Sequence, residues 1–185
     1  MERSTKQRGT TRHVRMLSAL LLVAGLVGVP AASAAPGDGT AGRDDQSVFK
    51  FTTMTPVIEP LTGATHPIRG VPGGGLPWEI NTAKAELTRD GTLQVKVDGL
   101  VLANRAPVPE PQQGTNPASS FMAVVSCMTV SNGAVENVSV STEAAPATPT
   151  GDAMIEESVE LPSPCIAPIV FVTSPTGSWF ATTGF

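Results

Sequence analysis

The sequence offers few side chains that could carry out catalysis, and His66 is the most informative of them. The chain has two histidines, His13 and His66. A histidine acts as a general base toward a serine nucleophile when a third group orients its ring. His66 lies in a segment rich in glycine and proline, and the chain contains no G-x-S-x-G nucleophile motif. This context favours a solvent-facing loop histidine over the base of a small secreted hydrolase.

Motifs for metal and phosphate chemistry are absent from the sequence. The two cysteines are not spaced as C-x-x-C, and His66 alone cannot complete a zinc site with them. The glycine run at positions 73–75 lacks the Lys-Ser/Thr continuation of a phosphate-binding loop. Glu156, Glu157 and Glu160 could supply a carboxylate pair for glycoside hydrolysis, but a solvated strand face explains them more simply. We therefore expect no metal, no cofactor and no catalytic residues.

The two cysteines, Cys127 and Cys165, lie in or beside β-like runs. An even pair of cysteines in an exported chain most often forms a disulfide. Closing a loop of this length would stabilise the fold by roughly 3–4 kcal/mol through the entropy of the denatured state. A redox-active or metal-binding thiol pair is the alternative. The sequence predicts a structural disulfide between Cys127 and Cys165.

Two tryptophans, Trp78 and Trp179, are the candidates for a sugar-stacking platform. Aromatic side chains are only 4% of the chain and tyrosine is absent, which is poor in aromatics for a carbohydrate binder. Trp179 lies in a predicted strand, so we expect it in the core. Trp78 follows Gly75-Leu76-Pro77 in a loop, and we expect it to be the exposed aromatic side chain of a carbohydrate or cell-wall binder, if the protein is one.

The first 34 residues have the three parts of a secretory signal peptide. Five basic residues and one acid precede residue 17, and the 13 residues of 17–29 are uncharged. Pro30 ends this stretch, and Ala32-Ser33-Ala34 supplies small residues for signal peptidase. An uncleaved anchor is the alternative, but a membrane-spanning helix needs about 20 apolar residues. We expect cleavage after Ala34 and a secreted protein that leaves the membrane.

Removal of residues 1–34 changes the charge of the protein. The whole chain has a formal net charge of −4, whereas residues 35–185 hold 7 Lys+Arg against 15 Asp+Glu, a net of −8. Nucleic-acid-binding proteins need clustered basic residues that displace counterions from phosphates. An acidic chain with scattered cations is therefore not expected to bind nucleic acid, and its attraction to anionic membranes is weak.

The first half of the mature chain shows a leader and a clear hairpin. Residues 35–47 are small and polar, which predicts a disordered leader before a single domain of residues 48–185. Residues 48–54 form a first predicted strand. Residues 83–87 and 93–97 alternate apolar and charged side chains on both sides of Asp90-Gly91. This pattern predicts a half-buried antiparallel pair with its charges on the solvent face.

The second half continues the β pattern to the end of the chain. Residues 120–130 are apolar at both odd and even positions, which predicts a central strand buried on both faces. A turn at Asn132-Gly133 and a return strand to residue 142 follow. Residues 153–161 suit a strand or a short helix, and β-branched side chains favour the strand. Residues 166–173 and 178–183 predict a last hairpin. The total is an all-β, antiparallel two-sheet sandwich of seven to eight strands.

A resemblance extends over roughly residues 75–185. It rests on residues 161–172 (LPSPCIAPIVFV), residues 178–181 (SWFA), the two cysteines, Leu76-Pro77-Trp78, Asp90-Gly91 and Gly99-Leu100. Together these segments resemble a group of uncharacterised secreted proteins of actinobacteria, which implies export and a compact β fold but no activity. The hairpin of residues 83–100 is also similar to the opening of CHRD-type β domains, in its small-x-Leu-x-x-Asp-Gly-x-Leu pattern.

Two long loops are the predicted recognition surface of a non-catalytic, secreted binding protein. They span residues 63–78 and 103–119, and they carry His66, Trp78 and Arg105. Loops on a rigid scaffold often carry function, although plain mobile connections would have the same composition. The expected partner is an extracellular or cell-envelope ligand whose identity, like the oligomeric state, the sequence does not specify.

Overall fold

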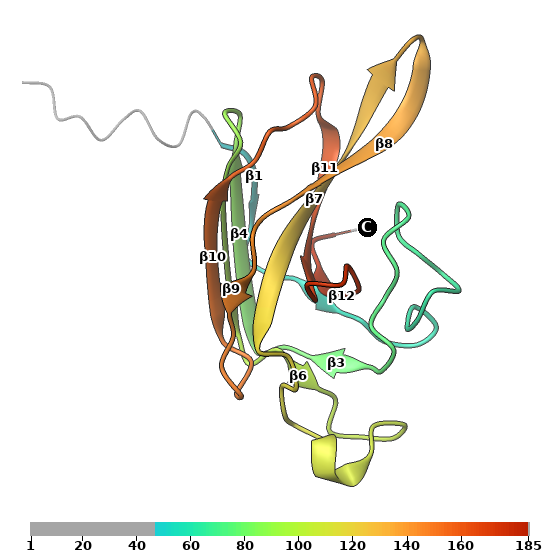
Figure 1. Cartoon of the computed structure of the whole chain (residues 1–185), viewed down its shortest axis with the longest axis vertical. Coiled ribbons are helices and arrows are strands. Elements are labelled where there is room, and N and C mark those ends of the chain that lie inside the picture. Colours follow the sequence, from blue (N-terminus) through green and yellow to red (C-terminus); the bar gives the residue numbers. More distant parts are fainter. Residues whose placement is uncertain (1–46, 185) are drawn as a thin grey trace, which may run out of the picture. The chain divides into compact units, whose positions relative to one another are not determined.

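The structure, a computed structural model, describes residues 47–184, and this part of the chain is all-β with antiparallel sheets (Figure 1). Its eight longer strands are β1 (Ser47–Phe51), β4 (Thr82–Thr88), β5 (Thr92–Asp98), β7 (Ser120–Ser131), β8 (Ala134–Ser141), β10 (Ala153–Ser158), β11 (Ile166–Thr173) and β12 (Trp179–Thr182). Four two-residue strands accompany them: β2 (Thr55–Pro56), β3 (Trp78–Glu79), β6 (Val101–Leu102) and β9 (Ala145–Pro146). The predicted antiparallel sandwich is confirmed.

Sheet A has the strand order β1-β4-β5-β10 and contains the predicted hairpin. The β4–β5 register aligns Ala83 with Val97 and Leu87 with Leu93, and all four side chains are buried. Gly91 closes the turn at φ +88°, a conformation that glycine adopts without strain. A Cβ at position 91 would also collide with the Val159 carbonyl, so both the φ angle and the packing of this turn require glycine.

Sheet B has the order β2-β12-β11-β7-β8, and β9 also pairs with β7. The β7–β8 hairpin turns at Asn132 and Gly133, whose φ angles of +50° and +79° suit a two-residue turn of the type that follows the strand twist. Five consecutive residues of β11, 169–173, are buried. The run 120–130, predicted to be buried on both faces, forms β7 in the middle of sheet B, but several of its side chains are partly exposed and Val130 is 49% exposed. The neighbouring β11 is the strand that is buried on both faces.

A long segment, residues 57–77, covers the face of sheet B that points away from sheet A; we call it the covering loop (Figure 1). It joins the edge of β12: Trp179 N donates to the Pro72 carbonyl at 2.9 Å, and Gly74 N donates to the Trp179 carbonyl at 2.8 Å. Trp179 and Phe171 are fully buried beneath it, with ring centroids 6.2 Å apart. Trp179 is a core residue, as predicted.

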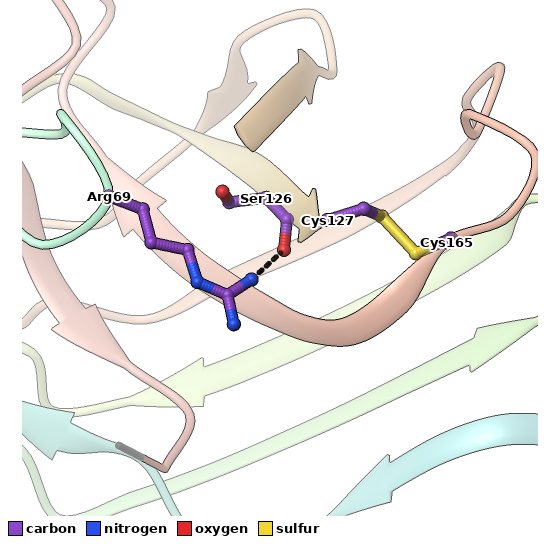
Figure 2. The surroundings of a disulfide bond; sticks show 4 residues. All are labelled: Arg69, Ser126, Cys127 and Cys165. Carbon is purple, nitrogen blue, oxygen red and sulfur yellow. Dashed lines mark hydrogen bonds between the residues drawn. A yellow bond between two sulfur atoms is a disulfide. The ribbon is translucent and has the colours of Figure 1, made fainter. Parts of the chain in front are cut away.

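The predicted disulfide between Cys127 and Cys165 is present and joins β7 to the start of β11 (Figure 2). The β7–β11 register shifts between Ile166 and Ile169, where the chain contains Pro168 and so lacks one N–H donor. Arg69 of the covering loop reaches this region and donates from Nη1 to the Ser126 carbonyl at 2.9 Å. Figure 2 shows this bond next to the disulfide.

Several boundaries and elements differ from the sequence predictions. The ambiguous segment 153–161 is a strand, β10, over Ala153–Ser158. Glu157, which faces the same side as buried Ile155, lies at the sheet edge and its Oε2 accepts a hydrogen bond from Glu143 N at 2.8 Å. β1 spans Ser47–Phe51, so it begins one residue before the predicted strand 48–54, inside the predicted leader, and ends three residues earlier. The predicted signal peptide (1–34) and the rest of the predicted leader (35–46) lie outside the described residues.

A search of residues 47–184 for helices with the length and apolarity needed to span a membrane finds none.

Candidate functional site

The two long loops meet at one end of the sandwich. The short strands β3, at the end of the first loop, and β6, directly before the second, pair so that Trp78 lies opposite Leu102. Ala103 N donates to the Pro77 carbonyl at 2.9 Å, which extends this pairing by one residue. The two segments that the sequence analysis proposed as recognition loops are therefore neighbours in space.

A groove with a volume of about 360 Å³ lies between these segments; we call it the loop groove. Its lining is apolar except for one amide side chain: Gly75, Leu76, Trp78, Leu102, Gln112, Pro117, Ala118 and Phe180. This volume lies near the lower limit of known ligand pockets, about 300–1,000 Å³. Such a groove can bury one or two apolar side chains and offer a hydrogen bond from Gln112.

The loop of residues 103–119 is internally hydrogen-bonded. The η2 turn (Glu110–Gln112) is followed by Gly114, whose N–H donates to the Leu102 carbonyl at 3.0 Å. Asn116 is 8% exposed, and its Nδ2 donates to the carbonyls of Ala118 and Thr148, each at 2.8 Å. These bonds fix the wall of the groove, so this loop is more than an extended connection.

Trp78, expected to be an exposed aromatic, is 3% exposed, and that expectation was wrong. Its ring stacks on Phe180 at a centroid distance of 4.0 Å and meets Phe121 edge-on at 6.3 Å. Pairing in β3 turns the side chain toward the sandwich interior. A sugar-stacking platform needs an open aromatic face, so Trp78 cannot provide one.

His66 lies on the exposed part of the covering loop. Its Nδ1 is 3.1 Å from the Pro60 carbonyl, a hydrogen bond made within the same loop. Within residues 47–184, the hydrogen bonds and ion pairs of the structure bring no serine, aspartate or glutamate to the imidazole. The geometry does not assemble the nucleophile–base pair that the hydrolase hypothesis requires.

Arg105, the third predicted surface residue, joins the loop of residues 103–119 to the covering loop. Its Nη1 lies 3.8 Å from Glu59 Oε2, and both side chains are about half exposed, at 47% and 51%. An exposed ion pair of this kind contributes at most about 1 kcal/mol. Asn104 N also donates to Glu79 Oε1 at 3.2 Å, which adds a second polar link at the same end of the sandwich.

Two carboxyl groups have lowered pKa values, and both lie in turns rather than in the loop groove. The Thr88 hydroxyl and then the Thr92 backbone lower the pKa of Asp90 in the β4–β5 turn. The Thr150 hydroxyl and then the Gly99 N–H lower the pKa of Asp152. Both carboxylates accept several hydrogen bonds and therefore stabilise turns. No group of three or more potential metal ligands occurs among residues 47–184.

The sequence analysis missed Phe180, Leu102 and Gln112 as groove residues. Phe180 belongs to a predicted strand, and nothing in its local sequence indicates that its ring stacks on a tryptophan 102 residues earlier. Gln112 belongs to a proline-rich stretch, PEPQQ, that could have suggested a turn.

Comparison with protein-family models, with curated protein sequences and with solved structures finds no match to this chain.

Proposed function

We propose that the protein is a secreted, non-catalytic binding module of the extracellular space or cell envelope, and that the loop groove takes an apolar segment of a protein partner. One observation carries this proposal: the two long loops converge on a single apolar groove whose walls are fixed by hydrogen bonds. The disulfide supports an oxidising compartment, since such bonds persist outside the cytosol.

The lining of the groove favours a peptide over a sugar. Sugars are held by open aromatic faces and several polar side chains, whereas Trp78 and Phe180 are 3% and 7% exposed and Gln112 is the one amide in the lining. An extended peptide with an apolar anchor needs a hydrophobic pocket and few side-chain hydrogen bonds.

Export is tested by the mature N-terminus. The full chain is expressed in a secreting bacterial host, and intact mass is measured on protein from the medium. The proposal expects a chain that begins at Ala35 with its two cysteines oxidised. Protein that stays in the cells with residue 1 retained contradicts it.

Binding is tested with a phage-displayed library of random 12-residue peptides panned on the exported protein. The blocking variant is Gly75→Trp, because Gly75 lines the groove and a Cβ there meets no atom within 4 Å, so the backbone has room to carry an obstructing side chain. The matched control is Ala144→Trp, an exposed position outside the groove. Enriched peptides with apolar anchors should bind the wild type and Ala144→Trp equally and Gly75→Trp at least tenfold more weakly. No enrichment, or equal binding to Gly75→Trp, contradicts the proposal.

A further inference from the structure

The outer face of sheet A carries a second groove, which gathers all three lysines of the described residues; we call it the lysine groove. It has a volume of about 300 Å³, and its lining includes Lys50, Lys84, Lys96, Glu86, Gln94 and Met154. The whole chain has a net charge of −4, so a general excess of basic residues does not account for this grouping.

Two rows of side chains cross this face, and the first has complementary polar partners on all four strands. The register aligns Lys50, Glu86, Gln94 and Glu156 from β1 to β10. Lys50 Nζ lies 3.4 Å from Glu86 Oε2, and Gln94 Nε2 donates to Glu156 Oε1 at 2.9 Å. Each polar group in this row has its partner on the neighbouring strand.

The second row breaks this rule. Lys84 lies directly opposite Lys96, and Met154 comes next on β10 with 51% of its surface exposed. Like charges directly opposite each other destabilise a sheet. Lys96 Nζ is 3.5 Å from Asp98, whereas no ion pair joins Lys84 to a carboxylate anywhere in the described chain. The row therefore places two lysines opposite each other, with an exposed apolar side chain next to Lys96.

We infer that the lysine groove binds a small single-chain amphiphilic anion, with its carboxylate, sulfate or phosphate between Lys84 and Lys96 and its aliphatic chain against Met154. An anionic headgroup supplies the negative charge that no side chain of the sheet places between Lys84 and Lys96. Side chains without a complementary partner are typical of functional sites. A volume of about 300 Å³ suits a short single chain.

Charge around the groove disfavours a membrane surface as the occupant. Glu86, Asp98 and Glu156 lie on the same face of sheet A, since they share the register positions and parity of the lysines. A plane of anionic lipid would meet these carboxylates as well as the lysines. A single headgroup contacts a smaller area centred on Lys84 and Lys96, and the one carboxylate that lines the groove, Glu86, is paired with Lys50 at 3.4 Å. The monomeric amphiphile is therefore the better match.

The test uses decanoate below its micelle concentration as the probe, and decyltrimethylammonium as the cationic probe with the same number of chain carbons. Backbone amide shifts of the oxidised protein are followed by NMR during titration. Decanoate should give saturable shifts in β4, β5 and β10, and the cationic probe should bind at least tenfold more weakly. Equal binding of both probes, shifts centred elsewhere, or no saturable binding at millimolar concentration overturns the inference.

Three variants locate the headgroup. Lys84→Gln with Lys96→Gln should weaken decanoate at least tenfold, and Lys84→Arg with Lys96→Arg should keep binding within about threefold, because charge is retained. Arg89→Gln, an exposed cation in the β4–β5 turn, should change binding less than twofold. The double glutamine variant should melt close to wild type, since the removal of the like-charge pair offsets the loss of the exposed Lys96–Asp98 ion pair. Unchanged decanoate affinity in a folded double glutamine variant overturns the inference.

The last measurement is the binding of the protein to vesicles of phosphatidylglycerol. The inference expects little co-sedimentation of the protein with them at 0.15 M salt, where surface charges are screened beyond about 8 Å. Strong co-sedimentation that is lost in the double glutamine variant, without decanoate binding, would assign the lysines to a membrane surface and overturn the inference.

Discussion

The outer faces of the two sheets differ sharply in what covers them. On sheet B, the register points Ile169, Phe171 and Trp179 away from sheet A, and each is at most 8% exposed. On sheet A, the corresponding face presents Lys84, Lys96 and Met154, and Met154 is 51% exposed. The covering loop makes this difference, because it packs over sheet B and hydrogen-bonds to the edge of β12.

The comparison shows that a loop rich in glycine and proline can belong to the core. Gly73 has no room for a Cβ, which would collide with the Leu61 carbonyl within the same loop. Val71 and Pro77 are buried, whereas the tip that carries His66 is exposed. The loop therefore acts mainly as a lid fixed on sheet B, and its exposed part is limited to a few residues.

The largest expected effect tests the covered face of sheet B. Trp179→Ala should lower the free energy of unfolding by about 3–5 kcal/mol, because it leaves a cavity beneath the covering loop. Met154→Ala, on the bare face of sheet A, should change it by no more than about 0.5 kcal/mol. Urea unfolding monitored by circular dichroism measures both. Similar losses in the two variants would show that the two faces are not different.

The disulfide comes next, since it links β7 and β11 in sheet B and sheet A has no such bond. Cys127→Ala with Cys165→Ala should lower the free energy of unfolding by about 4 kcal/mol, from the entropy of a loop with a sequence separation of 38. Chemical denaturation of the oxidised wild type and of the double variant gives the difference. A loss below about 1 kcal/mol would contradict a structural role.

A smaller effect is expected at Arg69, which ties the covering loop to β7. Arg69→Met should destabilise the protein by about 1–2 kcal/mol, because the Ser126 carbonyl loses a charged donor at a partly open site. Arg69→Lys should recover part of the loss. Thermal unfolding of both variants measures this effect, and equal melting temperatures for Arg69→Met and wild type would show that the bond does not hold the loop.

The smallest expected effect is on the pH dependence of the free energy of unfolding, and it concerns Asp152, which directly precedes β10 of sheet A. Hydrogen bonds from Thr150 and Gly99 lower the pKa of Asp152 below its ordinary value of 3.8, so the native state favours the carboxylate. Its contribution is therefore complete above that ordinary value and is lost as pH falls through the lower native pKa. The stability difference between wild type and Asp152→Asn should be constant from pH 7 to 5 and shrink below pH 4. A difference that grows on acidification would contradict the lowered pKa.

The sequence predicted the parts of the fold that local rules control. Alternation around Asp90-Gly91 and the Asn132-Gly133 dipeptide gave two hairpins, because side-chain period and turn chemistry act over a few residues. The cysteine pair could be predicted because only one intramolecular bond was possible. The segment 153–161 is compatible with a strand or a short helix by its sequence, and its pairing with β5 makes it a strand.

The candidate sites were harder to predict because they depend on distant segments. Trp78 is buried by Phe121 and Phe180, which lie 43 and 102 residues later in the chain. The Lys84–Lys96 pair follows from the hairpin register alone, but the position of Met154 beside it requires the pairing of β10 with β5. Long-range packing of this kind has no local signature.

Residue-resolved hydrogen exchange tests most directly whether the covering loop is part of the core of sheet B. The amides of Gly74 and Trp179 donate across the junction between the loop and β12, so both should exchange only through global unfolding, as slowly as Val172 in the centre of β11. Exchange of Gly74 and Trp179 at least a hundredfold faster than Val172 would show a loop that opens on its own, and would contradict its role as a fixed cover.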